Sequence, residues 1–152
     1  LATPGTVARA YTAQLINDFA SHCCVIPVGS RILAPAIESL FWHDSNIDEV
    51  LQQIKAALSE HPRAAEMDTV VLACTHFPLM QKPLSELLPN LQWIDSGEAI
   101  ARRVAHVINE LNLPLDSAGE HGLQEVLILG KEEATPILKR RLEDSRLCLI
   151  DY

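Results

Sequence analysis

Several features that would point to a particular class of protein are scarce in this sequence. Lysine and arginine number 12 against 20 aspartates and glutamates, which gives a net charge of −8. Because nucleic acids attract proteins through lysine and arginine, this balance argues against a nucleic-acid partner. No run approaches the roughly 18–20 apolar residues of a membrane span, and the residues after Leu1 do not resemble a signal peptide. We therefore predict a cytoplasmic protein with no membrane partner.

The cysteines show neither the spacing of a disulfide framework nor that of a zinc site. They are Cys23, Cys24, Cys74 and Cys148. Structural zinc sites usually show two short-spaced ligand pairs, so a site made of Cys74, His76 and the Cys23–Cys24 pair is disfavoured. We predict free thiols in a reducing compartment and no bound metal. Phosphate and dinucleotide loops are also missing, since neither G-x-x-x-x-G-K-[ST] nor G-x-G-x-x-G occurs.

The apolar residues alternate between strand-like and helix-like spacing. Short apolar runs predict strands over 24–28, 70–73, 91–95, 126–129 and 147–150, with helices between them. This alternation is typical of an α/β fold with a mainly parallel sheet flanked by helices. The polar stretch 114–122 predicts an exposed connection.

Capping residues predict where three of the helices begin. These are Thr6, then Ser45 or Asn46, then Thr135 with proline following it. The helix after Thr6 has apolar residues at every fourth position, namely Val7, Tyr11, Leu15 and Phe19. Asp95 or Ser96 is expected to cap a further helix.

The segment Asp68–Pro78 carries the most chemistry. Its apolar run Val70–Ala73 predicts a strand buried on both faces, and the run ends at Cys74, Thr75 and His76. Ligands of open α/β sheets bind beyond the carboxyl ends of the strands, so these three side chains lie where an active site is expected. The alternative is that Cys74 only fills space, since free cysteine is among the most buried residue types. The adjacent hydroxyl and imidazole favour the functional interpretation.

Two further positions are candidates of lower specificity. Thr3 and Thr6 also follow the tail of a strand, where their hydroxyls could bind a carboxylate or phosphate beside a helix start. Alternatively, Thr6 is only a helix cap. Glu38 lies in an otherwise apolar helix, either on its solvent face or held for an imidazole.

Three segments, in this order, resemble the glutamate racemase family. Residues 1–7, L-A-T-P-G-T-V, resemble its L-A-T-x-G-T-V segment. Residues 71–79, V-L-A-C-T-H-F-P-L, resemble its V-L-G-C-T-H-F-P-L segment, with Ala73 in place of the usual glycine. Residues 94–97, I-D-S-G, followed by A-I-A-R-R, resemble its I-D-S-G…A-x-R segment. The resemblance covers roughly Leu1 to Asn112.

The resemblance implies a cofactor-independent exchange of L- and D-glutamate that supplies D-glutamate for peptidoglycan. It also implies two similar α/β lobes that each contribute one catalytic cysteine, of which Cys74 is one. Thr75 and His76 would bind the substrate and assist that thiol, Thr3 and Thr6 would lie near the substrate, and Glu38 would interact with the histidine. The sequence leaves a homodimer open.

The chain also departs from the family pattern. The family's D-S-G-x-G-G and C-N-T-A motifs have no counterpart in these residues. We therefore expect the carboxyl-terminal part of a racemase, with residues 1–92 forming most of one lobe and residues 93–152 returning to the other. Alone it is expected to be inactive, because inversion by proton transfer needs an acid and a base on opposite faces. The alternative is a non-catalytic α/β module that binds a small acid.

Overall fold

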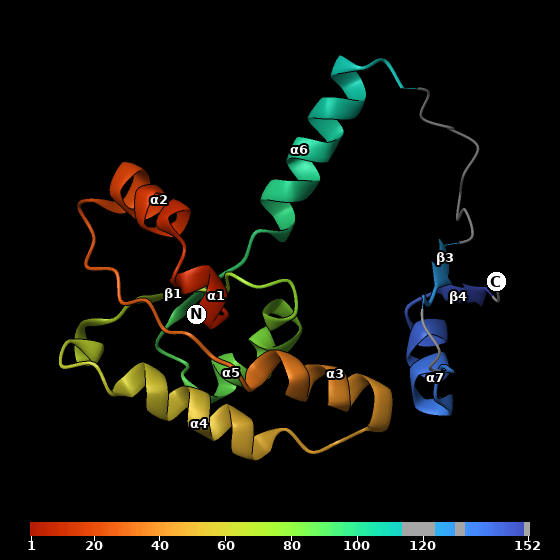
Figure 1. Ribbon diagram of the computed structural model, residues 1–152, viewed down its shortest axis with the longest axis horizontal. Helices are drawn as coiled ribbons and strands as arrows, with labels where there is room; N and C mark the ends of the chain where they lie inside the picture. Colours follow the sequence, from red (N-terminus) through yellow and green to blue (C-terminus); the bar gives the residue numbers. More distant parts are fainter. Residues whose placement is uncertain (114–123, 130–132, 151–152) are drawn as a thin grey trace. The chain divides into compact units, whose positions relative to one another are not determined.

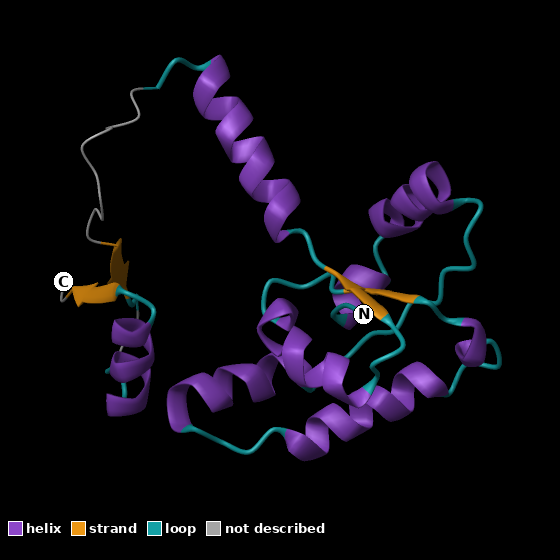
Figure 2. Cartoon of the chain, turned by 180° about the vertical axis from the view of Figure 1, so that it is seen from behind, coloured by secondary structure: helices purple, strands orange, loops and turns teal. Residues whose placement is uncertain are grey.

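A computed structural model describes residues 1–113, 124–129 and 133–150. The chain forms two compact units. Unit 1 comprises Leu1–Ile37 and Asn46–Glu98, and unit 2 comprises Glu38–Ser45 and Ala99–Tyr152. Helices alternate with parallel strands in both units, which confirms the predicted α/β class (Figures 1 and 2). The predicted lobe boundary between residues 92 and 93 stays a prediction.

The central strands of unit 1 are parallel, as predicted. Strand β1, Thr69–Val71, pairs with β2, Gln92–Ile94. On the other side of β1, Ala2 forms a parallel bridge with Ala73. Just after β1, successive amides point in opposite directions, because the Leu72 amide donates to the Ile94 carbonyl and the Ala73 amide donates to the Leu1 carbonyl. This strand therefore lies between its two neighbours.

The strand predicted over 24–28 is wrong as a regular strand. Only Gly29 forms a bridge, again parallel and with Ala2. Two backbone hydrogen bonds hold the segment there, from the Ala2 amide to the Val28 carbonyl and from the Ser30 amide to the Ala2 carbonyl. Pro27 lacks the amide hydrogen that a longer ladder needs.

The helices of unit 1 mostly follow the predicted pattern. They are α1 (Pro4–Val7), α2 (Ala10–Ala20), α4 (Asp48–Ser59) and α5 (Gln81–Leu87), with 3₁₀ turns η1 (Ala64–Glu66) and η2 (Phe77–Met80). Helix α3, Leu33–His43, begins in unit 1 and ends in unit 2. The predicted cap of α4 at Ser45 or Asn46 is wrong, because the N-cap is Ile47, which makes no side-chain capping bond. Asn46, one residue earlier, still accepts a hydrogen bond from the Asp48 amide at 2.7 Å.

The predicted cap at Thr6 is wrong. Thr3 is the N-cap of α1, and its side chain accepts from the Thr6 amide. Helix α2 starts separately after Arg9, which makes no side-chain capping bond. Helix α1 begins before Thr6 for a local reason. Pro4 occupies its first position, where the fixed φ of proline favours a helix. The apolar positions of α2 are nevertheless exposed, and Phe19 retains 76% of its surface.

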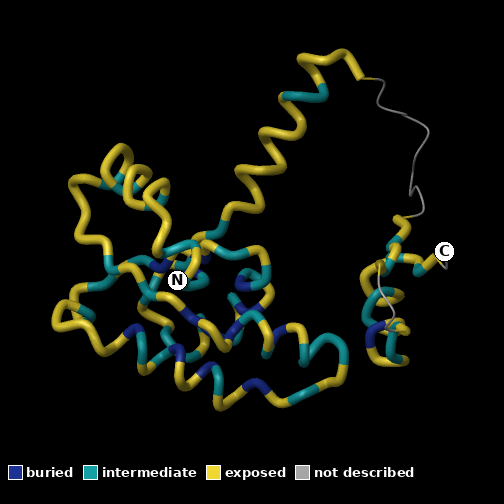
Figure 3. Tube along the Cα trace, viewed as in Figure 1, coloured by how far each residue is buried: buried dark blue, intermediate teal, exposed yellow. Residues whose placement is uncertain are grey.

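The core of unit 1 covers only one face of β1. Val70 and Leu72 are 3% and 2% exposed, whereas Val71 between them is 53% exposed. The expectation of a strand buried on both faces is therefore wrong. Alternate side chains of a strand point to opposite faces, and only one of the two faces is buried here. The other buried apolar side chains of unit 1 include Leu33, Ile37, Leu51, Ile54, Leu58, Phe77 and Leu84. Figure 3 shows the buried positions along the chain.

Unit 2 contains the rest of the described chain. Helix α6, Gly97–Glu110, has its first two residues in unit 1 and the rest in unit 2, and α7 spans Pro136–Asp144. Strands β3 (Gln124–Leu127) and β4 (Leu147–Ile150) are parallel partners. Strand β3 starts two residues earlier than predicted and ends at Leu127 rather than residue 129. The predicted connection 114–122 lies outside the described residues.

Thr135 joins the two helix ends in unit 2. As predicted, it caps α7, accepting from the Leu138 amide at 3.2 Å. Its hydroxyl also donates to the Trp42 carbonyl at the end of α3. Arg141 adds an ion pair with Asp44, at 2.6 Å between Nη2 and Oδ1. Within the described ranges, no helix is long and apolar enough to span a membrane.

Candidate functional site

The parallel register brings two polar segments to one edge of the sheet in unit 1. Ala2 pairs with Ala73, so Thr3 and Cys74 are the next residues of adjacent parallel segments. The Ala73 amide donates to the Leu1 carbonyl at 2.9 Å and fixes this register. Both polar segments therefore leave the sheet at its carboxyl end, where ligands of such sheets bind.

Cys74, Thr75 and His76 form a contact group. The Sγ of Cys74 lies 3.9 Å from Nδ1 of His76, and Oγ1 of Thr75 lies 3.4 Å from the same nitrogen. The ring nitrogen can accept the thiol proton in one tautomer. Cys74 is half-buried and Thr75 is exposed, so the thiol is partly shielded while the hydroxyl faces outward.

The turn that carries these side chains is anchored directly behind them. The Phe77 amide donates to the Cys74 carbonyl at 3.2 Å, and the Leu79 amide donates to the His76 carbonyl at 3.1 Å. The ring of Phe77 is fully buried. A buried aromatic one residue after His76 limits how far the turn can move, and so supports the sulfur–nitrogen contact.

Thr3 and Thr6 form a second contact group. Their Oγ1 atoms lie 3.0 Å apart, and the Thr6 amide donates to Oγ1 of Thr3 at 3.4 Å. Thr12 donates its hydroxyl to the Thr6 carbonyl at 2.6 Å, which ties the start of α2 to α1. The arrangement presents adjacent hydroxyls that can donate to an acidic ligand.

Two residues that support this edge were not singled out from the sequence. A Cβ at Gly29 would lie 3.2 Å from the Cα of Pro4, so the missing side chain lets the Thr3–Thr6 turn pack against this segment. Ser30 is buried, and its Oγ accepts from the Leu33 amide at 3.1 Å, which caps the start of α3. The sequence could have indicated the cap, because Ser30 stands three residues before Leu33. It could not indicate the approach of Gly29 to Pro4, because these residues are far apart in the chain.

The remaining sequence candidates are Glu38, Asp95 and the other cysteines. Glu38 belongs to unit 2, and its predicted interaction with the histidine stays a prediction. Asp95 follows β2, and its Oδ1 accepts from the Gly97 amide at 2.6 Å, in line with the predicted cap. Cys23, Cys24 and Cys148 are free and exposed. Among the described residues, no three His, Cys, Asp or Glu side chains are grouped to hold a metal ion.

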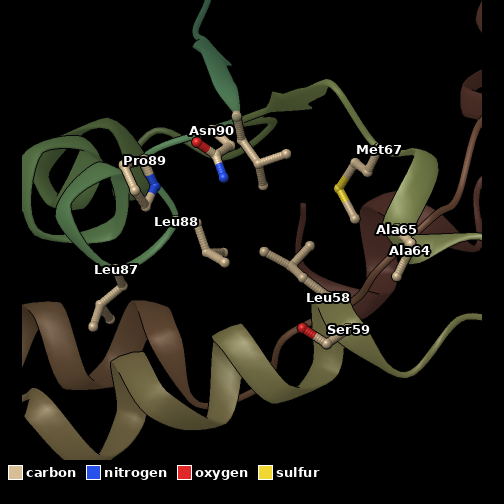
Figure 4. A pocket seen from close by; sticks show the side chains of 10 residues that line it. Leu58, Ser59, Ala64, Ala65, Met67, Leu87, Leu88, Pro89 and Asn90 are labelled. Atoms are coloured by element: carbon tan, nitrogen blue, oxygen red, sulfur yellow. The ribbon is translucent and has the colours of Figure 1, made fainter.

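Two cavities in unit 1 lie away from Cys74. One, of about 320 Å³, is lined mainly by apolar side chains of α4, η1 and the α5–β2 connection, with Leu58 and Leu88 pointing into it (Figure 4). The other, of about 630 Å³, is bordered by Asp68–Val71, along β1 and the residue before it. Neither cavity is lined by Cys74, Thr75, His76 or the two threonines.

Similar proteins give the site a context. The chain is 41% identical over 115 residues to glutamate racemase of Actinobacillus pleuropneumoniae serotype 7 (strain AP76), which covers 74% of this chain and 42% of that protein. It is 44% identical over 123 residues to glutamate racemase of Agrobacterium fabrum, covering 80% of this chain and 43% of the relative. The match to glutamate racemase of Rhizobium meliloti is 46% over 110 residues, or 71% and 39% of the two chains.

A solved structure agrees with these relatives. The crystal structure of Escherichia coli glutamate racemase in complex with L-glutamate and the activator UDP-MurNAc-Ala matches with a TM-score of 0.75 and 31% identity. The match covers 97% of this chain and 54% of that chain. No family model matches the sequence. The chain spans about two fifths of the length of these curated relatives. By sequence and by fold, the chain is similar to glutamate racemases over part of their length.

Proposed function

We propose that this chain supplies one of the two acid–base groups of a glutamate racemase, in a protein as long as its relatives. Cys74 would remove the α-proton of one glutamate enantiomer as a thiolate, and a second group on the opposite face would deliver a proton. Run in reverse, the Cys74 thiol would deliver the proton. The observation that carries the proposal is the 3.9 Å contact between Cys74 Sγ and His76 Nδ1 at the carboxyl edge of the sheet.

The arrangement suits proton transfer at a weakly acidic carbon. An ordinary cysteine has a pKa of about 8.5, so a neighbouring base that takes the thiol proton increases the amount of reactive thiolate at neutral pH. The hydroxyls of Thr3, Thr6 and Thr75 would hold the substrate carboxylates, where donors stabilise the charge that develops on deprotonation. Glu38 would orient the imidazole. D-Glutamate formed in this way would serve peptidoglycan synthesis in the cytoplasm.

The first test is activity of the 152-residue chain itself. Unit 1 brings one thiol to the site, and the other described cysteines line a separate cavity or lie on β4 in unit 2. We expect no racemisation by this chain, whereas the full-length protein racemises glutamate. Circular dichroism of L- and of D-glutamate solutions measures both. A protein-dependent decay with the 152-residue chain, lost in Cys74→Ala, would contradict the need for a second group outside it. If the full-length protein also leaves both solutions unchanged, it is a non-catalytic acid-binding protein.

The second test concerns His76 in the full-length protein. His76→Asn keeps a polar side chain but removes the base, and should lower kcat/KM by about 10²-fold, the scale of a general acid–base contribution. Both directions must lose the same factor in kcat/KM, because the free enantiomers have equal energy, whereas kcat alone can respond unequally.

Alkylation separates this role from packing. At pH 7, iodoacetamide should modify Cys74 more slowly in His76→Asn than in the wild type. If His76 only packs the turn, the variant will show reduced stability with unchanged alkylation and turnover. Cys148→Ser, at an exposed position of β4, is the matched control and should change neither rate.

A further inference from the structure

The larger cavity of unit 1 lies between two stretches of backbone that Leu1 and Ala2 hold apart. One wall is Asp68–Val71, which includes β1, and the other wall includes residues 24–26 and Val28. Leu1 lines the cavity as well, and the cavity volume is about 630 Å³. Since Ala2 forms parallel bridges to both walls, to Gly29 and to Ala73, the cavity continues the line of the Leu1–Ala2 backbone between them.

Leu1 and Ala2 have the hydrogen bonds of a middle strand. The Leu1 nitrogen donates to the Val71 carbonyl at 2.9 Å, on the side of β1. Ala2 bonds on the other side, because its amide donates to the Val28 carbonyl and its carbonyl accepts from the Ser30 amide. Successive residues therefore bond alternately to the two walls, as in a parallel strand between two parallel neighbours.

The same alternation points backbone groups of β1 into the cavity. The Leu72 amide donates to the Ile94 carbonyl of β2, whereas the Val71 carbonyl accepts from Leu1. Odd-numbered residues of this strand thus direct their amide and carbonyl groups away from β2. The Val71 amide and the Thr69 carbonyl consequently point toward the cavity.

The wall before Gly29 follows the same rule. Val28 bonds to Ala2, so Ile26, two residues earlier, directs its amide and carbonyl to the same side. Pro27 therefore removes a hydrogen-bond donor only from the outer side of this segment. Exposure alternates here as it does along a strand, because Ile26 and Val28 are half-buried whereas Val25 and Pro27 are exposed.

We propose that the cavity holds one further stretch of strand, formed by the three residues that precede Leu1 in a protein as long as its relatives. If the register of Ala2 with Ala73 continues, these residues lie beside Thr69–Val71. Neighbouring strands lie about 4.7–4.9 Å apart, so two walls that share one bridging residue are separated by roughly 9.5 Å, the width that one strand fills.

Each proposed residue has defined backbone partners. The residue directly before Leu1 donates to the Ile26 carbonyl and accepts from the Val28 amide. The second residue before Leu1 donates to the Thr69 carbonyl and accepts from the Val71 amide. The third accepts from the Ile26 amide. These bonds satisfy the backbone groups that the two walls direct into the cavity.

The covalent connection favours this occupant over a second copy of the chain. A segment joined to Leu1 is already held at one end of the cavity and runs in the required direction. Its docking is intramolecular, whereas a separate chain loses translational and rotational freedom when it binds. The proposal requires only that residues precede Leu1 in the full-length protein, which is longer than this chain if it matches its relatives.

Hydrogen–deuterium exchange tests the proposal without any need for racemase activity. In the full-length protein, NMR should show the Val28 and Val71 amides exchanging within about tenfold of the Leu72 amide, which already bonds to Ile94. In the 152-residue chain, the rates of Val28 and Val71 relative to Leu72 should be at least about tenfold higher than in the full-length protein, because the proposed acceptors are missing.

Proline substitution tests the same bonds by their effect on stability. Val28→Pro removes an amide that points into the cavity, and Val25→Pro makes the same change at an amide that points outward. In urea titrations, Val28→Pro should lower the midpoint of unit 1 more in the full-length protein than in the 152-residue chain. Val25→Pro is the matched control and should lower the midpoint equally in both.

Three results would overturn the proposal. The first is exchange of Val28 or Val71 more than about tenfold faster than Leu72 in the full-length protein, a criterion that holds even if the shorter chain does not fold. The second is protection of these amides in the full-length protein that rises with protein concentration, which would assign the cavity to a second copy. The third is an equal loss of stability from Val28→Pro in the two proteins.

Discussion

Cys74→Ser in the full-length protein is expected to lower racemisation by roughly 10²–10⁴-fold, the scale of a lost general acid–base group. Serine is nearly isosteric with cysteine, so the contacts of the turn, including the bond from the Phe77 amide to the residue 74 carbonyl, should survive. A hydroxyl is a far weaker acid than a thiol, however, and its alkoxide is not available near neutral pH. The proposed base on one face of the substrate is then missing while the fold is intact.

Isotope exchange gives this variant a distinctive signature. In deuterium oxide, the second acid–base group can still remove the α-proton of the enantiomer that it faces and return a deuteron to the same face. Proton NMR should therefore show α-exchange from one enantiomer without inversion. Exchange from both enantiomers, or racemisation at a near-normal rate, would mean that Cys74 is a structural residue. Unchanged circular dichroism in the far ultraviolet is the control for folding.

Phe77→Ala is expected to reduce the free energy of unfolding of unit 1 by about 3–5 kcal/mol, the usual range for a buried aromatic replaced by alanine. The ring is fully buried, in the same core as Leu33, Ile37 and Leu84. A cavity left at this position removes contacts from several elements at once. It should also loosen the turn that holds Cys74 and His76, because Phe77 follows them directly.

Trp93 on β2 can report this unfolding separately from unit 2. Its Nε1 atom is buried, so exposure to water should shift its emission, and Trp42→Phe removes the other tryptophan of the chain. Urea titration of Phe77→Ala and of Leu79→Ala in this background gives the comparison. Leu79 is 52% exposed, and its replacement by alanine should lower the free energy of unfolding by only about 0.5 kcal/mol. Similar costs for the two variants would contradict the anchoring role of Phe77.

The features that the sequence predicted correctly are those with a local physical cause. The apolar run 70–73 predicted a strand, and β1 includes its first two residues, Val70 and Val71. Thr135 with Pro136 predicted a helix start, because the hydroxyl caps the helix and the ring fixes φ, and α7 begins there. The alternation of such signals was enough for the α/β class and for parallel pairing. The Cys-Thr-His turn after β1 was likewise visible from the order of its residues.

Local signals failed where two explanations were equally compatible with the sequence. Threonine is a favoured capping residue at position 3 and at position 6, and the position of Pro4 decided in favour of Thr3. The run 24–28 had the composition of a strand but forms no regular ladder, because Pro27 interrupts its donors and only Gly29 reaches Ala2.

The sequence by itself determined the class of fold, the helix starts with strong caps and the cluster Cys74, Thr75 and His76. Only the tertiary structure decided that Thr3 stands beside Cys74, since the bridge between Ala2 and Ala73 joins segments far apart in the chain. It also decided that β1 is buried on one face and that Gly29 admits Pro4. These outcomes depend on which surfaces meet, and periodicity within one segment contains no information about the segment that will cover it.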